Sequence, residues 1–409
     1  MNNFRQPPLF LNHLPGCVQL IFPPNEKPIT PKYTHQFFGP TSTIFGYTQL
    51  RIILRYTPSL KHCFYKLTAE SMLPFTDQTD HSRANLKKML KQYFAPNSFL
   101  TTEKSYNSKE INEISNPIFK APGKILEHFT DLKDRKFIIS HSRLKDLNTQ
   151  SYFKKIQHVS LWFVDGISLI NVEDPNWHVF FLFEKVTANI EPNVSNDKQN
   201  VNNEKEKEKE KEKEIQMEIE QEQEKEQKKE YLVLAGFVTV YRFSLSSEEQ
   251  KMRISHFLLL PHYDDSSLKL KLLRTLNKYI LTKPKVIEFN VEDPLMDLQL
   301  LRNAIDASRV IHYQTKKSRE PTKEDLLEIR KLYKMNLRQT RIALEIFYLL
   351  ISGTENQNGS QKIEIARKLM KNRLNQEFDE KMILNMNNRI KFEEKNHLQA
   401  IELIKSWKN

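Results

Sequence analysis

The chain has 409 residues, enough for two or three domains, and carries a formal charge of +12 from 63 Lys and Arg against 51 Asp and Glu. Its two cysteines, Cys17 and Cys63, stand apart from any Cys and His cluster at ligand spacing, which excludes a disulfide framework and predicts no metal site. We find no secretory signal and no apolar run of about 18 residues, which predicts a soluble intracellular protein without membrane contact. No tract mixes basic and aromatic residues as a nucleic-acid site would.

The first 158 residues mix strand-like runs, such as QLRIILRY and FIISHS, with loops, which predicts a separate α+β unit. Within this unit Gly39 and Gly46 frame the aromatic-rich stretch HQFFGPTSTIFGY, which by itself predicts a turn and core packing. The histidines are scattered along the chain, and their spacing suggests no Ser, His and Asp triad.

Two runs rich in aromatic and β-branched residues, 177–186 and 231–243, predict neighbouring strands. Between them, residues 196–230 are a low-complexity tract dominated by Glu and Lys that has no apolar face, so they cannot join a core. We expect a solvated insertion, either disordered or a lone helix, that lengthens the connection between the two strands, and we assign it no function.

The next segments alternate between strand and helix patterns. Residues 253–260 (RISHFLLL) predict a buried strand, and residues 267–280 predict a helix with an apolar stripe. Residues 285–291 predict another strand, after which Asp293 and Pro294 suit the N-cap and the first position of a helix. The order β-β-β-α-β-α over residues 177–306 predicts an α/β (α+β) fold with a mixed sheet flanked by helices.

The C-terminal region predicts helices. Thr322 with Asp325, and Asn336 with Gln339, have the spacing of capping boxes, and residues 361–409 continue with a weaker helical pattern. From residue 313 onward there are 20 Lys and Arg against 13 Asp and Glu, which is typical of a solvated basic helical surface.

Two places are candidate sites. The turn PHYDDSS before helix 267–280 could bind a diphosphate, because a helix N-terminus offers unpaired N–H groups and a partial positive charge. The ordinary alternative is that Asp265 or Ser266 caps the helix, and the segment alone favours that alternative. Glu292, at the end of a strand, is a candidate general base, although an exposed residue at a helix start is the more common case.

Taken together, these segments resemble the catalytic subunits of type B histone acetyltransferases, which are members of the GNAT superfamily. The similar segments run in the family's order over most of residues 17–375: PKYTHQFFG, FGYTQLRIILRY, SLWFVDGISLINVEDPNWHVFFLFEK, GFVTVYRF, RISHFLLLPHY, VEDP with LQLLRN, and LEIRKLYKMNLRQTRIALEIF. The resemblance implies an N-terminal α+β domain at residues 1–158, a GNAT-type acetyltransferase domain at 159–312 that contains the insertion, and a C-terminal helical region at 313–409.

The resemblance also implies an acyltransferase that moves acetyl from acetyl-CoA to lysines in the N-terminal tail of newly made histone H4, with a WD-repeat histone chaperone as partner and residence in the nucleus and cytoplasm. The family's general base falls on Glu292, with Asp293 and Asp165 as secondary catalytic candidates. Acetyl-CoA is expected at Phe257, Leu258, Leu259, Asp264, Asp265, Ser266, Ser267, Leu268, Lys269 and Leu270. Contacts to the substrate tail are expected at Pro40, Thr41, Ser42, Trp177, Tyr241, Arg242 and Phe243.

Two segments depart from the family pattern. The family's diphosphate turn is rich in glycine, with glutamine or arginine, whereas residues 264–270 are DDSSLKL, so two carboxylates stand where phosphates are expected. The acidic residues that follow the FFG turn in the family are Pro40, Thr41 and Ser42 here. A catalytically impaired relative that binds histone or chaperone as a scaffold is therefore the alternative function.

Overall fold

The computed structural model describes residues 11–41, 43–72, 80–115, 119–189, 228–314, 320–353, 359–377 and 386–407. The chain divides into two compact units, Met1–Asp174 with Phe181–Gly236, and Pro175–Phe180 with Phe237–Asn409. Residues 196–227 of the predicted insertion lie outside the described residues, whereas residues 228–230 are the start of a strand. The insertion is therefore shorter at its C-terminal end than the sequence pattern predicts.

The first unit contains a five-stranded sheet in the order β3-β2-β6-β7-β9. Strand β2 pairs in parallel with β6, and β6 pairs antiparallel with β7, which confirms the strand expected from QLRIILRY. The strands are β2 (Val18–Phe22), β3 (Asn25–Ile29), β6 (Arg51–Tyr56), β7 (Cys63–Thr68) and β9 (Phe99–Leu100). Two small sheets pair β1 (Leu11–His13) with β4 (Thr43–Phe45) and β5 (Tyr47–Thr48) with β8 (Ser71–Met72).

The first unit also contains helices and a cluster of aromatic side chains. Phe37 stacks on Trp162 with ring centroids 3.7 Å apart, and the indole of Trp162 donates to the hydroxyl of Tyr56 over 3.3 Å. All three side chains are buried, so they belong to the core of this unit. The helices are α1 (Leu14–Cys17), α2 (His35–Phe38), α3 (Asp80–Lys91), α4 (Glu103–Ser115), α5 (Leu147–Ile156) and the 3₁₀ helix η2 (Gln157–Trp162).

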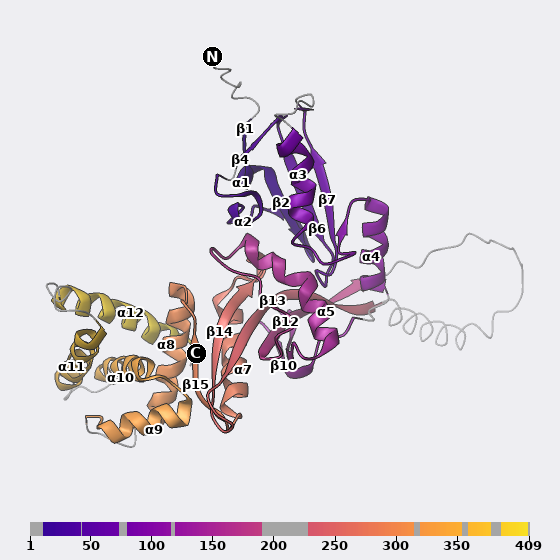
Figure 1. The fold of residues 1–409 in the computed structure, drawn as a ribbon. Helices are drawn as coiled ribbons and strands as arrows, with labels where there is room; N and C mark the ends of the chain where they lie inside the picture. The colour runs from indigo at the N-terminus through magenta and orange to yellow at the C-terminus, as the bar shows by residue number, and fades with distance from the viewer. Residues whose placement is uncertain are drawn as a thin grey trace, which may run out of the picture. The chain divides into compact units, whose positions relative to one another are not determined.

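A second, six-stranded sheet runs in the order β10-β11-β12-β13-β14-β15 (Figure 1). Its strands are β10 (Lys124–Thr130), β11 (Lys136–Arg143), β12 (Trp177–Asn189), β13 (Lys228–Ser244), β14 (Gln250–Leu259) and β15 (Val286–Val291). The pair β10 and β11 is antiparallel and the pair β14 and β15 is parallel, so the sheet is mixed as expected. β10 and β11 belong to this sheet although they precede residue 158, where the sequence predicts a domain boundary. The predicted boundaries at residues 158 and 312 stay predictions.

The predicted order of strands and helices after residue 177 is confirmed. Helix α7 (Ser266–Leu281) follows β14 and a 3₁₀ turn at Pro261–Tyr263, and its stripe of Leu272, Leu273, Leu276 and Ile280 is buried. The expected N-cap at Asp293 is wrong, because α8 (Met296–Gln314) begins three residues later. Asp293 has a φ of 34°, so the backbone turns at this residue. Two more residues follow before the first helical position, Met296.

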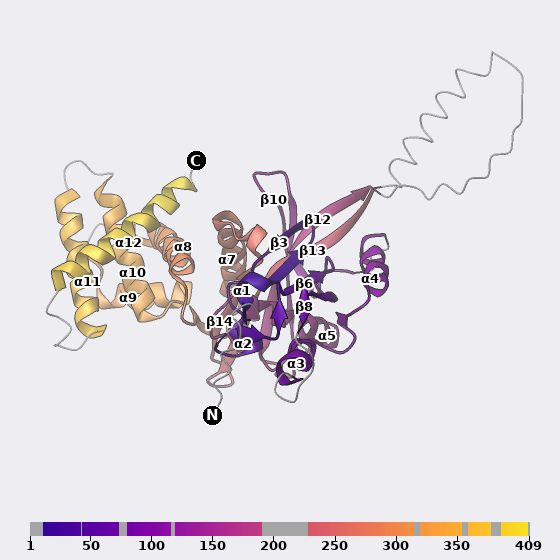
Figure 2. The same cartoon turned by 90° about the horizontal axis from the view of Figure 1, so that it is seen from above.

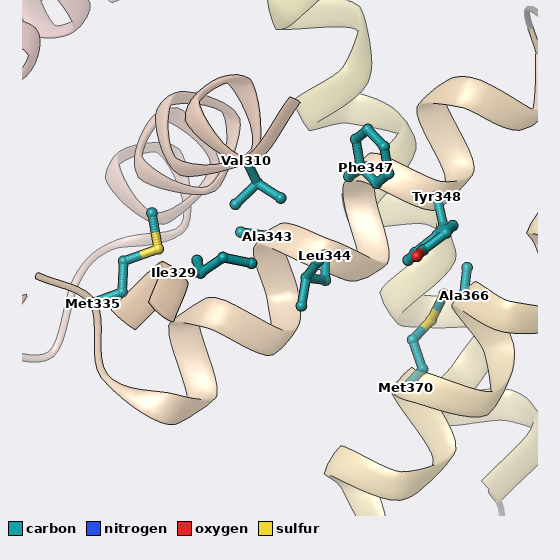
Figure 3. Packing of buried hydrophobic residues seen from close by; sticks show 9 residues of the cluster. All are labelled: Val310, Ile329, Met335, Ala343, Leu344, Phe347, Tyr348, Ala366 and Met370. Atoms are coloured by element: carbon teal, nitrogen blue, oxygen red, sulfur yellow. The ribbon is translucent and has the colours of Figure 1, made fainter. Parts of the chain in front are cut away.

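The C-terminal helices are α9 (Lys323–Tyr333), α10 (Leu337–Ser352), α11 (Gly359–Glu377) and α12 (Met386–Ser406). Thr322 and Asp325 form the predicted capping box, and the Asn336 side chain accepts from the Gln339 amide. Figure 2 shows these four helices grouped with α8. Buried residues of α8 to α11 and of the turn after α9 form one core (Figure 3): Val310, Ile329, Met335, Ala343, Leu344, Phe347, Tyr348, Ala366 and Met370.

The structure confirms the expected fold class, a mixed sheet flanked by helices with an N-terminal α+β part and a C-terminal helical part. Within the described part of the chain, no helix combines the length and the apolar character that crossing a bilayer requires.

Candidate active site

The two parallel strands β14 and β15 end at different points, and this difference creates the candidate site. β15 ends at Val291, which pairs with Ile254, whereas β14 continues to Leu259. The amide of Glu292 makes one further bond, to the carbonyl oxygen of Ile254 over 2.9 Å, before the chain turns at Asp293. The last five residues of β14 therefore extend past β15, and an extended ligand that carries amides can lie along this stretch.

Glu292 lies at the point where the two strands separate, and both of its carboxylate oxygens have partners on β14. The hydroxyl of Ser255 donates to Oε2 over 2.9 Å, and Nη2 of Arg253 lies 2.9 Å from Oε1. The Glu292 side chain is 40 % exposed, so water and a substrate can still reach it. Because an ionised carboxylate has about four acceptor positions, these two contacts leave room for a further donor.

An aromatic surface lies next to this carboxylate. The rings of Trp177 and Tyr241 are 4.8 Å apart, and those of Tyr241 and Phe243 are 4.7 Å apart, both in edge-to-face arrangements. The guanidinium of Arg253, which pairs with Glu292, lies over the Phe243 ring at 5.0 Å. The predicted substrate residues Trp177, Tyr241 and Phe243 thus share one surface with Glu292, and the half-buried rings can hold the aliphatic part of a long side chain.

His256 follows Ser255 on β14 and is neutral at physiological pH. Burial lowers the pKa of His256 to about 4, although the negative charge of Glu292 acts in the opposite direction. Its backbone N–H donates to the hydroxyl of Thr239 on β13 over 3.0 Å. The side chain therefore adds no positive charge beside Glu292 at pH 7.

The turn that leads into α7 is closed by its own side chains. Asp265 is the N-cap, and its Oδ1 accepts from the amides of Ser267 over 2.7 Å and Leu268 over 3.4 Å. The same oxygen accepts from the Ser267 hydroxyl over 2.5 Å. The ordinary alternative for this turn, a helix that Asp265 caps, is therefore what the structure contains.

Lys269 ties this turn to the next helix. Its Nζ lies 2.6 Å from Asp264 Oδ1 and 2.5 Å from Asp297 Oδ2, and the side chain is 15 % exposed. Burial by itself lowers the pKa of Lys269, but the two carboxylates outweigh it, so the pKa is raised and the ammonium is charged. The side chains of Leu268 and Leu270 are buried in the core, which leaves only their backbone atoms for a ligand.

Three of the predicted site residues that the structure describes lie in the other unit. Asp165 has its Oδ1 3.1 Å from Nε2 of His35. Pro40 and Thr41 form an exposed turn after α2, where Gly39 has a φ of 88° that only glycine adopts easily. Ser42 lies outside the described residues. The roles assigned to all of these side chains stay predictions.

The sequence reasoning missed three residues that the structure brings to the site, namely Arg253, Ser255 and Asp297. The sequence contained a signal for Arg253 and Ser255, because alternation along a strand puts residues 253 and 255 on one face, and both are polar. No local pattern marks Asp297 as a partner of Lys269.

As for metals, the described residues include no group of three His, Cys, Asp or Glu side chains that could hold an ion.

Comparison with known families identifies proteins that this chain resembles. Residues 17–165 match a family model described as the N-terminus of histone acetyl transferase HAT1. A histone acetyltransferase type B catalytic subunit from Mus musculus is 23 % identical over 355 residues, covering 83 % of this chain and 74 % of that protein. A histone acetyltransferase type B catalytic subunit from Dictyostelium discoideum is 25 % identical, covering 84 % of this chain and 66 % of that protein. One from Candida albicans is also 25 % identical, covering 78 % of this chain and 70 % of that protein.

Among solved structures, an aminoglycoside acetyltransferase from an uncultured soil sample is similar over 46 % of this chain and 91 % of its own, with 13 % identity and a TM-score of 0.22. This similarity is too low to carry an argument about function.

Proposed function

This chain is related to the histone acetyltransferase type B catalytic subunits, and on that basis we propose that it transfers acetyl from acetyl-CoA to lysine side chains of a histone. The observation that supports the proposal most is the position of Glu292. It lies where β14 and β15 separate, beside an aromatic surface, with Ser255 and Arg253 fixing both oxygens.

The chemistry requires a base and little else from the protein. A lysine amine has a pKa of about 10.4, so at pH 7 it is protonated and cannot attack a thioester. Glu292 takes one proton from the ammonium, and the amine attacks the acetyl carbonyl to form the new C–N bond. The C–S bond then breaks, and the leaving sulfur takes the second proton that the nitrogen loses, which releases the thiol of CoA. The aromatic surface of Trp177, Tyr241 and Phe243 positions the lysine stem, and the stretch of β14 beyond β15 holds the coenzyme arm.

Glu292→Gln tests this role, because the amide keeps the size of the side chain but cannot accept the proton. We expect kcat for histone acetylation to fall by about 10²–10⁴-fold, while calorimetry shows unchanged binding of acetyl-CoA. Glu288→Gln is the matched control. It lies on the same strand, where Glu288 pairs with Lys251 over 3.6 Å, and should leave kcat within about twofold. An unaffected rate in Glu292→Gln would remove Glu292 from the mechanism, and Asp293→Asn would then be the next variant to measure.

The proposal extends to the substrate, the partner and the compartment. We propose the N-terminal tail of newly made histone H4 as substrate, a WD-repeat histone chaperone as partner, and residence in the nucleus and cytoplasm. Mass spectrometry of an equimolar mixture of core histones is expected to find acetyl groups mainly on the H4 tail. Acetylation spread evenly over all histones would contradict the substrate assignment. Co-purification with the chaperone tests the proposed partner, and imaging of the tagged chain tests the proposed compartments.

A second candidate function rests on the turn before α7. Asp265 occupies the amides of Ser267 and Leu268, which a diphosphate would need, so a chain without coenzyme binding could serve as a histone- or chaperone-binding scaffold. Calorimetry compares acetyl-CoA binding to the native chain and to a quadruple variant, Asp264→Gln, Asp265→Gly, Ser267→Gly and Lys269→Gly. Heat only in the variant supports the scaffold, and micromolar binding by the native chain supports the enzyme.

A further inference from the structure

The N-terminus of α7 already holds an anion, the carboxylate of Asp265. A helix leaves its first N–H groups without partners, and these groups are what a phosphate binds. Here the amides of Ser267 and Leu268 donate to Asp265, and the Ser267 hydroxyl donates to it as well. A diphosphate at this position would have to displace a charged group that belongs to the chain itself.

The charges around the turn also oppose a diphosphate. Asp264 lies next to Asp265 in sequence, and Asp297 approaches from the first turn of α8. Asp264 and Asp297 share the ammonium of Lys269, and the carboxylate of Asp265 adds a further negative charge at the helix N-terminus, which repels an anion at close range.

The strand before the turn has the opposite character. β14 continues five residues past β15, and Leu258 and Leu259 are buried, so the stretch is an apolar strand edge rather than a charged surface. It runs from Ser255, which contacts Glu292, toward the turn. The pantetheine arm is an extended chain with two amides and a terminal thioester, and such a chain is suited to pairing with a strand edge.

We propose that this chain recognises its acyl donor through the acyl-pantetheine arm and not through the diphosphate, and that Asp265 is the residue that determines this specificity. The inference rests on the proposed acetyltransferase function. Donors that lack the nucleotide, such as acetyl-pantetheine, are then used about as well as acetyl-CoA. The transfer itself is the same: the C–S bond of the thioester breaks, a C–N bond to lysine forms, and the pantetheine thiol leaves with a proton.

The test compares kcat/KM for acetyl-CoA and acetyl-pantetheine on a histone tail peptide, with the full-length protein. For the native chain we expect the two values to agree within about threefold, since the nucleotide gains no favourable contact. Asp265→Asn removes the charge but keeps a side-chain oxygen that caps the helix, so the fold is maintained. In this variant kcat/KM for acetyl-CoA should rise about tenfold or more, while that for acetyl-pantetheine stays within about twofold.

Asp146→Asn is the matched control, because Asp146 caps α5 in the same manner and accepts from the Thr149 amide over 2.9 Å. It should leave the ratio of the two donors unchanged. A native chain that prefers acetyl-CoA by about thirtyfold or more overturns the inference, as does an Asp265→Asn variant with an unchanged ratio. In both cases the proposed acetyltransferase function survives. If neither donor reacts with any variant, the proposed function fails and this inference fails with it.

Discussion

His158 shows, at the scale of single residues, that burial alone can fix the charge of a side chain in this protein. Its ring is buried, lies 4.0 Å from the ring of Phe94, and has Nε2 3.2 Å from the hydroxyl of Tyr56. Burial lowers the pKa of His158 to about 3, so the folded protein keeps this ring neutral over most of the acidic range.

This burial makes the stability of the protein depend on pH. The unfolded chain protonates His158 below a pKa of about 6.5, whereas the folded chain does so only near 3, so the unfolded state binds more protons between these values. Lowering the pH from 7 to 5 should therefore reduce the free energy of unfolding by about 2 kcal/mol through this residue. Urea unfolding at both pH values measures the effect.

In His158→Gln the loss between pH 7 and pH 5 should be smaller by about that amount, although the variant is less stable at both pH values. His128→Gln, at an exposed position on β10, is the control and should retain the native pH dependence. A His158→Gln variant with the full native pH dependence would contradict this explanation.

At the scale of secondary-structure elements, one buried ion network joins three C-terminal helices. Glu345 on α10 accepts from Nε and Nη2 of Arg373 on α11, each over 2.9 Å, and its Oε2 lies 2.9 Å from Nε2 of His397 on α12. The three side chains are 0 %, 1 % and 1 % exposed. Burial would raise the pKa of Glu345, but its bonds to His397 and Arg373 outweigh that effect and lower it, so the group is ionised.

Removing one partner of this network should destabilise the helical region strongly. Arg373→Met leaves the Glu345 carboxylate buried without its main partner, and we expect a loss of about 3–5 kcal/mol in the free energy of unfolding. Adding Glu345→Met removes the stranded charge, so the double variant should recover most of the loss. Urea denaturation followed by circular dichroism measures both.

Arg338→Met is the matched control, because Arg338 pairs with Glu377 over 3.0 Å and is 54 % exposed. That variant should cost less than about 1 kcal/mol. A double variant no more stable than Arg373→Met alone would mean that the loss comes from packing and not from the unpaired carboxylate.

At the scale of the whole molecule, β12 and β13 each contribute residues to both compact units. The connection between these strands comprises 38 residues, 190–227, and consists mostly of the Glu- and Lys-rich tract. The pairing of β12 with β13 therefore joins segments that are far apart along the chain, and the entropic cost of bringing two segments together rises with the number of residues between them.

Deleting residues 196–227 should stabilise the protein. The connection falls from 38 to 6 residues, which reduces the entropic cost of bringing the two strands together by about 1.5 kcal/mol. The sequence predicts no function for this tract, so kcat for acetyl transfer should not change. Urea unfolding and a histone acetylation assay measure the two effects. A deletion variant that is less stable, or that loses activity, would show that the tract contributes contacts of its own.

Local sequence signals predict most of the elements that build the site. The strands β12 to β15 and helix α7 lie where the aromatic, β-branched and apolar patterns place them, and the caps at Thr322 and Asn336 are also as predicted. These signals work because the interactions behind them span four residues or fewer. The start of α8 is the exception, because Asp293 turns with a positive φ where the sequence favoured a cap.

The sequence by itself determined the order of strands and helices, the identity of Asp265 as a possible cap, and the resemblance to an acetyltransferase family. Only the tertiary structure decided that Ser255 and Arg253 hold Glu292, and that Lys269 is committed to Asp264 and Asp297. Ser255 and Glu292 are 37 positions apart. Contacts of this kind depend on how the strands pair and where β15 ends, and no pattern within a few residues of either partner encodes that arrangement.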